Sequence, residues 1–79
     1  MMDELDLVVL LTDVPAHKLK AGDIGTIVYV HEGGKGYEVE FMTLSGETIS
    51  VESLPAQSVR LASGNEIAHA RRVTEAAYP

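Results

Sequence analysis

The stretch Tyr37-Glu38-Val39-Glu40-Phe41-Met42-Thr43 decides the fold, because apolar and acidic residues alternate along its first five positions. Its tyrosine, valine and phenylalanine fall on one side of an extended chain, and Glu38 and Glu40 fall on the other. This alternation predicts a β-strand with one face in a hydrophobic core and one face in water.

Similar segments lie on either side of this strand and are separated from it by turn residues. Residues 32–36 hold three glycines, and Ser45-Gly46 is typical of a tight turn. Residues 47–52 alternate again, which predicts that Ile49 and Val51 point inward. One helical turn is expected at 54–57, where Pro55 suits the first helical position. The expected strands are 6–12, 24–31, 37–43, 47–52 and 58–61.

Five short strands within about 60 residues favour a small antiparallel barrel, because closing the sheet removes its unpaired edges. The single helical turn before the last strand is a feature of SH3-like barrels. We therefore expect a mostly all-β protein, with a five-stranded SH3-like antiparallel barrel over residues 1–61 and a tail over 62–79.

The tail has the composition of a short C-terminal helix. Residues 66–77 are rich in alanine and contain no glycine, and Asn65 suits the N-cap position. Glu66 near the start and Arg71-Arg72 further along have the charge signs that a helix dipole favours. A helix of about three turns is marginal by itself, so we expect it to dock on the barrel, on a second copy or on a partner.

The composition indicates an acidic protein that stays in water. The 79 residues carry 12 Asp and Glu against 6 Lys and Arg, a net charge of −6, and 46% are hydrophobic. No apolar run approaches the roughly 20 residues that span a bilayer, and the start of the chain is acidic where a signal peptide is basic. We expect a cytoplasmic protein with no membrane partner.

Nothing in the sequence predicts catalysis, and we expect no enzyme activity, no cofactor and no metal. The chain contains no cysteine, and no serine lies in a Gly-x-Ser-x-Gly motif. His17, His31 and His69 lack the paired spacing of a zinc site. The glycine-rich segment 32–36 lacks the Gly-Lys-Ser/Thr ending of a phosphate-binding loop, so it is expected to be a hairpin connection.

Two resemblances support the barrel. Residues 19–30, which contain Gly22-Asp23 and Gly25, resemble the turn of SH3-like barrels such as the KOW segments of ribosomal and transcription-elongation proteins. Over residues 6–61 the chain is similar to a family of short, uncharacterised bacterial proteins that is known as a domain of unknown function. This second resemblance rests on the blocks 6–10, 19–23, 25–26, 36–41 and 46–48. It implies an SH3-like barrel without an assigned activity, and it supplies no catalytic or binding residue.

Charge argues against a nucleic-acid partner. Residues 1–61 hold ten acidic residues against four basic ones, a net charge of −6. Affinity for a polyanion comes largely from Lys and Arg that neutralise phosphates. A nucleic-acid-binding or ribosome-associated KOW-like barrel is therefore an alternative and not the first expectation.

Protein binding is the function that we expect. Glu38 and Glu40 share a strand face, with Glu47 and Glu52 expected close by, and this charge would attract a basic partner. The alternative is a solvated outer face that keeps a small domain soluble and monomeric. In the strand 24–31, Val28 and Val30 are expected inward, so Ile27 and Tyr29 are expected outside as candidate interface residues. For Tyr29, packing under the tail is an equal alternative.

The first strand has the same surplus of apolar residues, with Val8 and Leu10 opposite Leu7, Val9 and Leu11. The apolar residues on the outer side of this strand would be covered by the C-terminal tail or by another protein. By analogy of size and charge, the chain would be the antitoxin, immunity or adaptor half of a bacterial two-protein system. A structural homo-oligomer, with a homodimer formed through the tail, is the second alternative.

Overall fold

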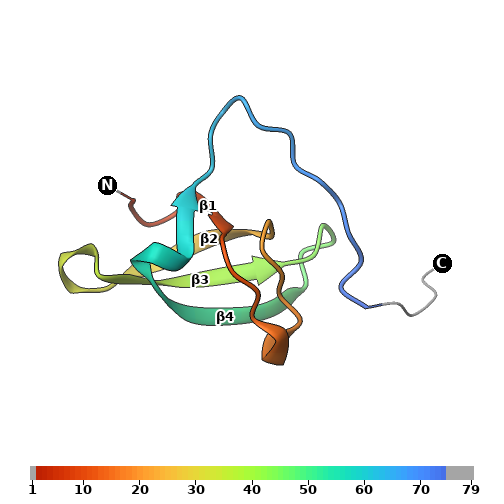
Figure 1. Cartoon of the computed structure of the whole chain (residues 1–79), viewed down its shortest axis with the longest axis horizontal. Coiled ribbons are helices and arrows are strands. Elements are labelled where there is room, and N and C mark those ends of the chain that lie inside the picture. The colour runs from red at the N-terminus through yellow and green to blue at the C-terminus, as the bar shows by residue number, and fades with distance from the viewer. Residues whose placement is uncertain (1, 75–79) are drawn as a thin grey trace.

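A computed structural model describes residues 2–74. Five strands within them form one antiparallel sheet in the order β4-β3-β2-β1-β5 (Figure 1). All five predicted strands are present, with bounds that differ by a few residues. The strands are β1 (Leu7–Leu10), β2 (Ile24–Val30), β3 (Gly36–Met42), β4 (Thr48–Pro55) and β5 (Val59–Leu61). The 3₁₀ turns are η1 (Pro15–His17), η2 (Glu32–Gly34) and η3 (Ala56–Ser58), so the predicted helical turn begins two residues later than expected.

The core lies on the concave face of the sheet and confirms the alternation predicted for 37–43. Tyr37, Val39 and Phe41 are buried there, each at most 3% exposed. Burying a side chain of this size contributes about 1.5–3 kcal/mol, and β3 supplies more of the buried core than any other strand. The other buried side chains are Val8, Leu10, Leu19, Ile27, Leu54 and Val59.

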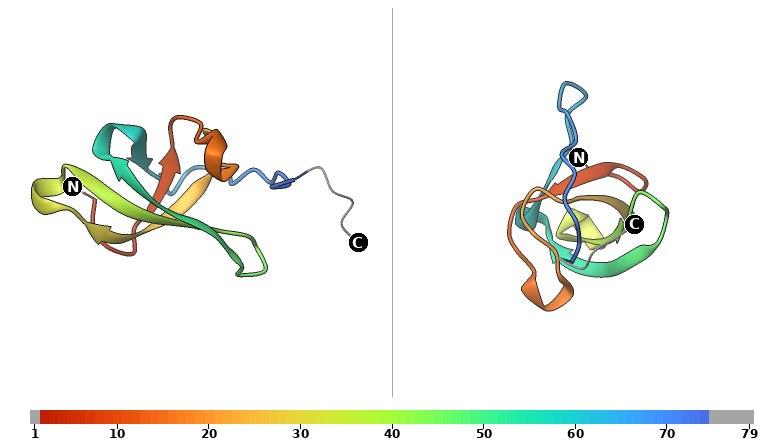
Figure 2. Two further views of the ribbon diagram at one scale, coloured as in Figure 1. Left: turned by 90° about the horizontal axis from the view of Figure 1, so that it is seen from below. Right: turned by 90° about the vertical axis from the view of Figure 1, so that its right-hand side faces the viewer.

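The sheet does not close into a barrel, so the predicted SH3-like barrel is wrong in this respect. The sheet curls around the core when it is viewed along the long axis (Figure 2, right), but β4 and β5 remain its two edges. A tight hairpin would have paired these consecutive strands with each other. The turn η3 instead carries the chain across the end of the sheet. The N–H of Ala56 donates to the carbonyl of Lys35, and the carbonyl of Ser58 accepts from Leu11.

Ile27 faces the core, which corrects the expectation that it lies outside. Ile27 is opposite Val39 and Tyr29 is opposite Glu38, so Val28 is an extra residue on β2. Such a β-bulge shifts the alternation of inward and outward side chains by one position. Ile27 is therefore fully buried, Val28 is 40% exposed instead of inward, and Tyr29 lies outside as expected.

A second bulge changes the phase of β4. Ser50 is opposite Phe41 and Thr48 is opposite Met42, which leaves Ile49 as the extra residue. Ile49 packs partly against the core as expected, but Val51 is 51% exposed and does not point inward.

The same shift moves Glu52 to the inner face. Glu52 pairs with Val39 of the core, not with Glu38 or Glu40. There its carboxylate accepts a hydrogen bond from Ser50 and lies 3.4 Å from Nδ1 of His17, which projects from η1.

The tail is an extended strap, and the predicted C-terminal helix is absent from residues 62–74. The last part of the predicted helix, 75–77, lies outside the described residues. Glu66, expected in the first helical turn, is bound instead by both terminal nitrogens of Arg60 and by the N–H of Ser63. A three-turn helix gains little without docking, and Ile67 of its intended apolar stripe is 95% exposed. Within residues 2–74 no helix has the length and apolar character needed to cross a membrane.

Candidate protein-binding surfaces

The convex face of the sheet brings together three of the four residues that the sequence singled out. Tyr29 on β2 is opposite Glu38 on β3, and Glu40 lies two residues further along β3, opposite Val51 on β4. Tyr29 is 54% exposed. We call Tyr29, Glu38, Glu40 and Val51 the outer-face patch. Ile27 does not belong to it, because the bulge at Val28 turns Ile27 into the core.

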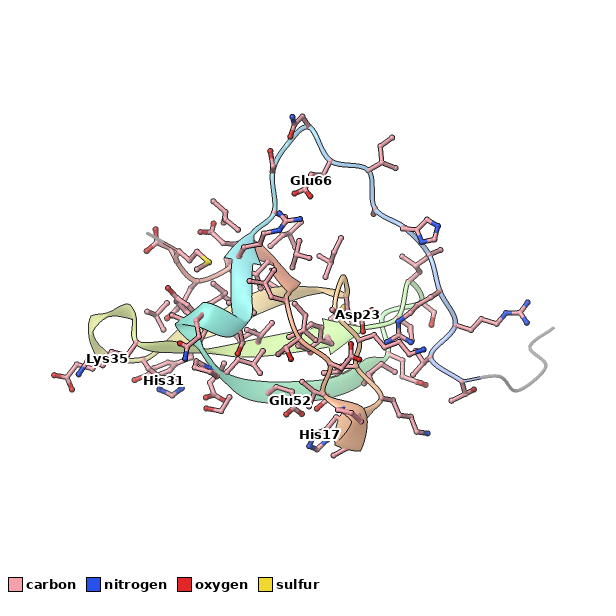
Figure 3. All side chains as sticks on the ribbon, in the orientation of Figure 1. His17, Asp23, His31, Lys35, Glu52 and Glu66 are labelled. Atoms are coloured by element: carbon pink, nitrogen blue, oxygen red, sulfur yellow. The ribbon has the colours of Figure 1, made fainter. Side chains whose placement is uncertain are left out.

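His31 adds a polar cluster that the sequence analysis missed. Its Nε2 lies 2.6 Å from Oε2 of Glu38 and 3.3 Å from Oγ of Ser53, and its ring meets that of Tyr29 edge to face at a centroid distance of 5.4 Å. The signal was present in the sequence, because residues 29 and 31 share a face of an extended chain. Figure 3 places His31 at the end of the sheet that also holds Lys35.

This cluster holds Glu38 in its charged form. Hydrogen bonds from Ser53 first and from His31 second keep the pKa of Glu38 below its usual value, against the opposing effect of desolvation. A deprotonated Glu38 beside an exposed tyrosine offers an apolar ring and a fixed negative charge in one place. Such a pair suits contact with a basic protein surface.

The Ser53–His31–Glu38 cluster is not a catalytic triad. In a triad, the serine and the acid contact different nitrogens of the histidine, so that the ring can take a proton from one while it is oriented by the other. Here both Ser53 and Glu38 contact the same Nε2. Within the part of the chain that the structure describes, no group of three or more histidine and acidic side chains could hold a metal ion.

A second site lies at the opposite end of the sheet, where Asp23 faces the tail (Figure 3). Nε of Arg71 donates to Oδ1 of Asp23 at 2.7 Å and its Nη2 donates to Oδ2 at 2.5 Å, while Nη2 also donates to the carbonyl of Lys18 at 2.9 Å. Burial would raise the pKa of Asp23, but hydrogen bonds from Arg71 and from the N–H of Lys20 outweigh it, so the pKa lies below its usual value. We call Asp23 and the Lys18 carbonyl the arginine notch.

Two hollows adjoin the arginine notch. Val73 lines a small depression of about 310 Å³ together with Asp13, Pro15, Lys18, Leu19 and Lys20. A larger open groove of about 1230 Å³ lies between the loop 16–24, the β3–β4 hairpin and the tail, with Phe41 and Ile49 among its lining residues. The tail therefore borders both hollows and fills neither.

The predicted second apolar layer on β1 is present. Leu7 and Leu11 are about half exposed, on the other side of the chain from the buried Val8 and Leu10. Ile24 beside them is 39% exposed. They have this exposure with residues 62–74 of the tail in place, so the described part of the tail leaves them largely uncovered.

The chain belongs to a family described as a domain of unknown function, DUF4926, whose model matches residues 4–61. The match covers the whole sheet and the arginine notch, and it ends where the tail begins. No curated protein and no solved structure matches the chain. The expected family of unknown function is therefore confirmed, and the likeness to KOW-type proteins stays a prediction.

Proposed function

We propose that this chain is a non-enzymatic protein-binding module whose outer-face patch contacts a basic partner. The observation that supports the proposal most directly is the pairing of the exposed Tyr29 with Glu38, with Glu40 next along the same face. Aromatic residues are enriched at protein interfaces, and an exposed ring with a polar tip contributes both area and a hydrogen bond.

Charge and packing have separate roles in this proposal. The net charge of −6 attracts a positively charged surface from a distance and raises the rate of encounter. Once the partner is seated, Tyr29 and Val51 provide the apolar contact, and Glu38 and Glu40 pair with its Lys or Arg side chains. An inhibitory or adaptor role in a two-protein bacterial system fits such a module, and so does a cytoplasmic location.

The test begins with coexpression of the chain with the product of the neighbouring gene. Association rates of the copurified partner are then measured at several salt concentrations for the wild type and for E38K/E40K. The double variant is expected to associate at least about tenfold more slowly and with a flatter salt dependence, since steering accounts for factors of about 10 to 1,000.

A matched control has the same change in net charge. In E4K/E47K the two substituted residues lie outside the strands, so this variant should retain most of the wild-type rate at moderate salt. Equal rates for both double variants would remove the outer-face patch from the proposal.

Two other results would favour different functions. Retention of RNA or DNA on a filter at low salt, with affinity that falls steeply as salt rises, would favour a nucleic-acid-binding protein. A dimer mass in light scattering, without any partner, would favour a structural homo-oligomer.

A further inference from the structure

We propose that the loop between β1 and β2 is a binding site for an Arg-x-aliphatic segment of a partner protein, and that Arg71–Val73 of the tail occupies it as an internal ligand. The site does not include any residue of the outer-face patch, so this proposal can be tested separately from the function proposed above.

The loop builds the site without help from the tail. Val14 and Leu19 exchange two backbone hydrogen bonds of 2.9 and 3.2 Å, and Lys18 between them adopts a left-handed conformation with φ 62°. The N–H of Lys20 donates to Oδ2 of Asp23 at 2.8 Å. Both acceptor groups of the arginine notch are thus fixed by contacts within residues 14–23.

The contacts of the tail define what the site recognises. The side chains at 71 and 73 reach the loop, Arg71 at the notch and Val73 at the adjoining depression, with Arg72 between them. The site therefore reads a guanidinium at one position and an aliphatic side chain two positions later.

Arginine suits the notch better than lysine. The Arg71 guanidinium makes three N–H···O contacts to the loop, two to the carboxylate of Asp23 and one to the carbonyl of Lys18, and its Nη1 donates to the carbonyl of Arg72. A lysine ammonium has no planar fork and cannot reproduce the two parallel contacts to Asp23. A partner segment is thus expected to carry arginine at this position.

The rest of the tail is attached loosely enough to be displaced. Every residue from 63 to 72 is exposed, and the Arg71 contacts link positions 48 and 53 residues apart in sequence. The loop lies inside the family domain at 4–61, while the internal ligand lies outside it. A site built by the domain and filled by an appended segment is open to another segment of the same chemistry.

The experiment uses the full chain in which R71A empties the notch. The probe is an end-capped peptide with the sequence of residues 68–74, titrated while the amide signals of Lys18, Leu19 and Asp23 are followed by NMR. R71A is expected to show saturable shifts in the millimolar range. The wild type, whose tethered segment competes at an effective concentration of the same millimolar size, should bind about twofold more weakly.

Matched controls separate recognition from general charge attraction. R72A removes the neighbouring arginine and should resemble the wild type. A peptide with lysine at the Arg71 position should bind R71A at least about tenfold more weakly, and adding D23N should abolish the shifts. R71K, which keeps the tail cationic, should bind the peptide to an intermediate degree and tests the site even if R71A folds poorly.

Two results would overturn the proposal. One is an R71A chain that ignores the peptide, or that binds the arginine and lysine peptides equally. The other is a concentration-dependent dimer of the wild type that is lost in R71A, because the occupant would then be the tail of a second copy and not a partner protein.

Discussion

Cγ1 of Val39 lies 2.5 Å from the position that a β-carbon on Gly25 would occupy. Cε1 of Phe41 lies 2.9 Å from the same position, and the carbonyl oxygen of Glu40 lies 3.0 Å from it. Real β-carbons almost never approach other atoms so closely. Glycine at this point lets the side chains of β3 close over the backbone of β2.

Replacing Gly25 by alanine is expected to destabilise the protein by about 1–3 kcal/mol, because the added methyl overpacks the core. Urea denaturation measures the change. G64A is the matched control, since nothing lies within 4 Å of Gly64, and it should leave the midpoint unchanged. Equal midpoints for the two variants would contradict the close approach of β2 and β3.

The β-bulge at Val28 makes neighbouring residues respond very differently to truncation. I27A removes a fully buried side chain and should cost about 2–5 kcal/mol. V28A removes a side chain that is 40% exposed and should cost less than about 1 kcal/mol. Thermal unfolding of the two variants distinguishes this arrangement from the regular alternation in which Ile27 faces outward.

The start of the tail should resist acid. The hydrogen bond from Arg60, followed by that from the N–H of Ser63, lowers the pKa of Glu66 from its ordinary value of 4.5 to about 2. A lowered pKa in the folded state means that the pair stabilises the tail above pH 4.5. This stabilisation is lost as the pH falls towards 2.

An NMR titration of the Glu66 side chain in the wild type and in R60A checks this behaviour. R60A should return the pKa most of the way to 4.5, and a pKa that is the same in both proteins would contradict the Arg60–Glu66 contact.

Tyr29 should matter for binding and not for stability. Its side chain is 54% exposed, so Y29A is expected to change the free energy of unfolding by less than about 1 kcal/mol. Its affinity for the partner is expected to fall at least about tenfold, as for an aromatic residue near the centre of an interface. Y37A serves as the contrast, because Tyr37 is buried and its loss should weaken folding itself.

Period-two patterns predicted most of the sheet, and the errors arose where pairing inserts an extra residue. The alternation in 37–43 placed β3 and its three core residues correctly. The same reasoning failed for Ile27 and Val51, because a bulge precedes or follows each of them and no local signal in the sequence marks it. Glu38 and Glu40 were found because β3 has no extra residue and keeps a regular alternation, and Tyr29 was found because it pairs with Glu38 beyond the bulge on β2.

The tail could not be predicted from local propensity. Alanine content and charge order favoured a helix over 66–77, but two arginine contacts decide the path of residues 62–74. One links Arg60 to Glu66, and the other links Arg71 to Asp23 across 48 residues. Contacts over such a separation leave no mark in a window of a dozen residues. The arginine notch was missed for the same reason.

The eight-residue β4 is an edge of the sheet, so along its outer side it carries main-chain donors and acceptors that no neighbouring strand within residues 2–74 uses. Rows of this kind recruit further strands, and Pro55 at one end of β4 and the bulge at Ile49 near the other shorten the stretch that is open to such recruitment. Self-association into fibres at high concentration would therefore start from residues 50–54, and a proline at a solvent-facing N–H of that stretch would suppress it.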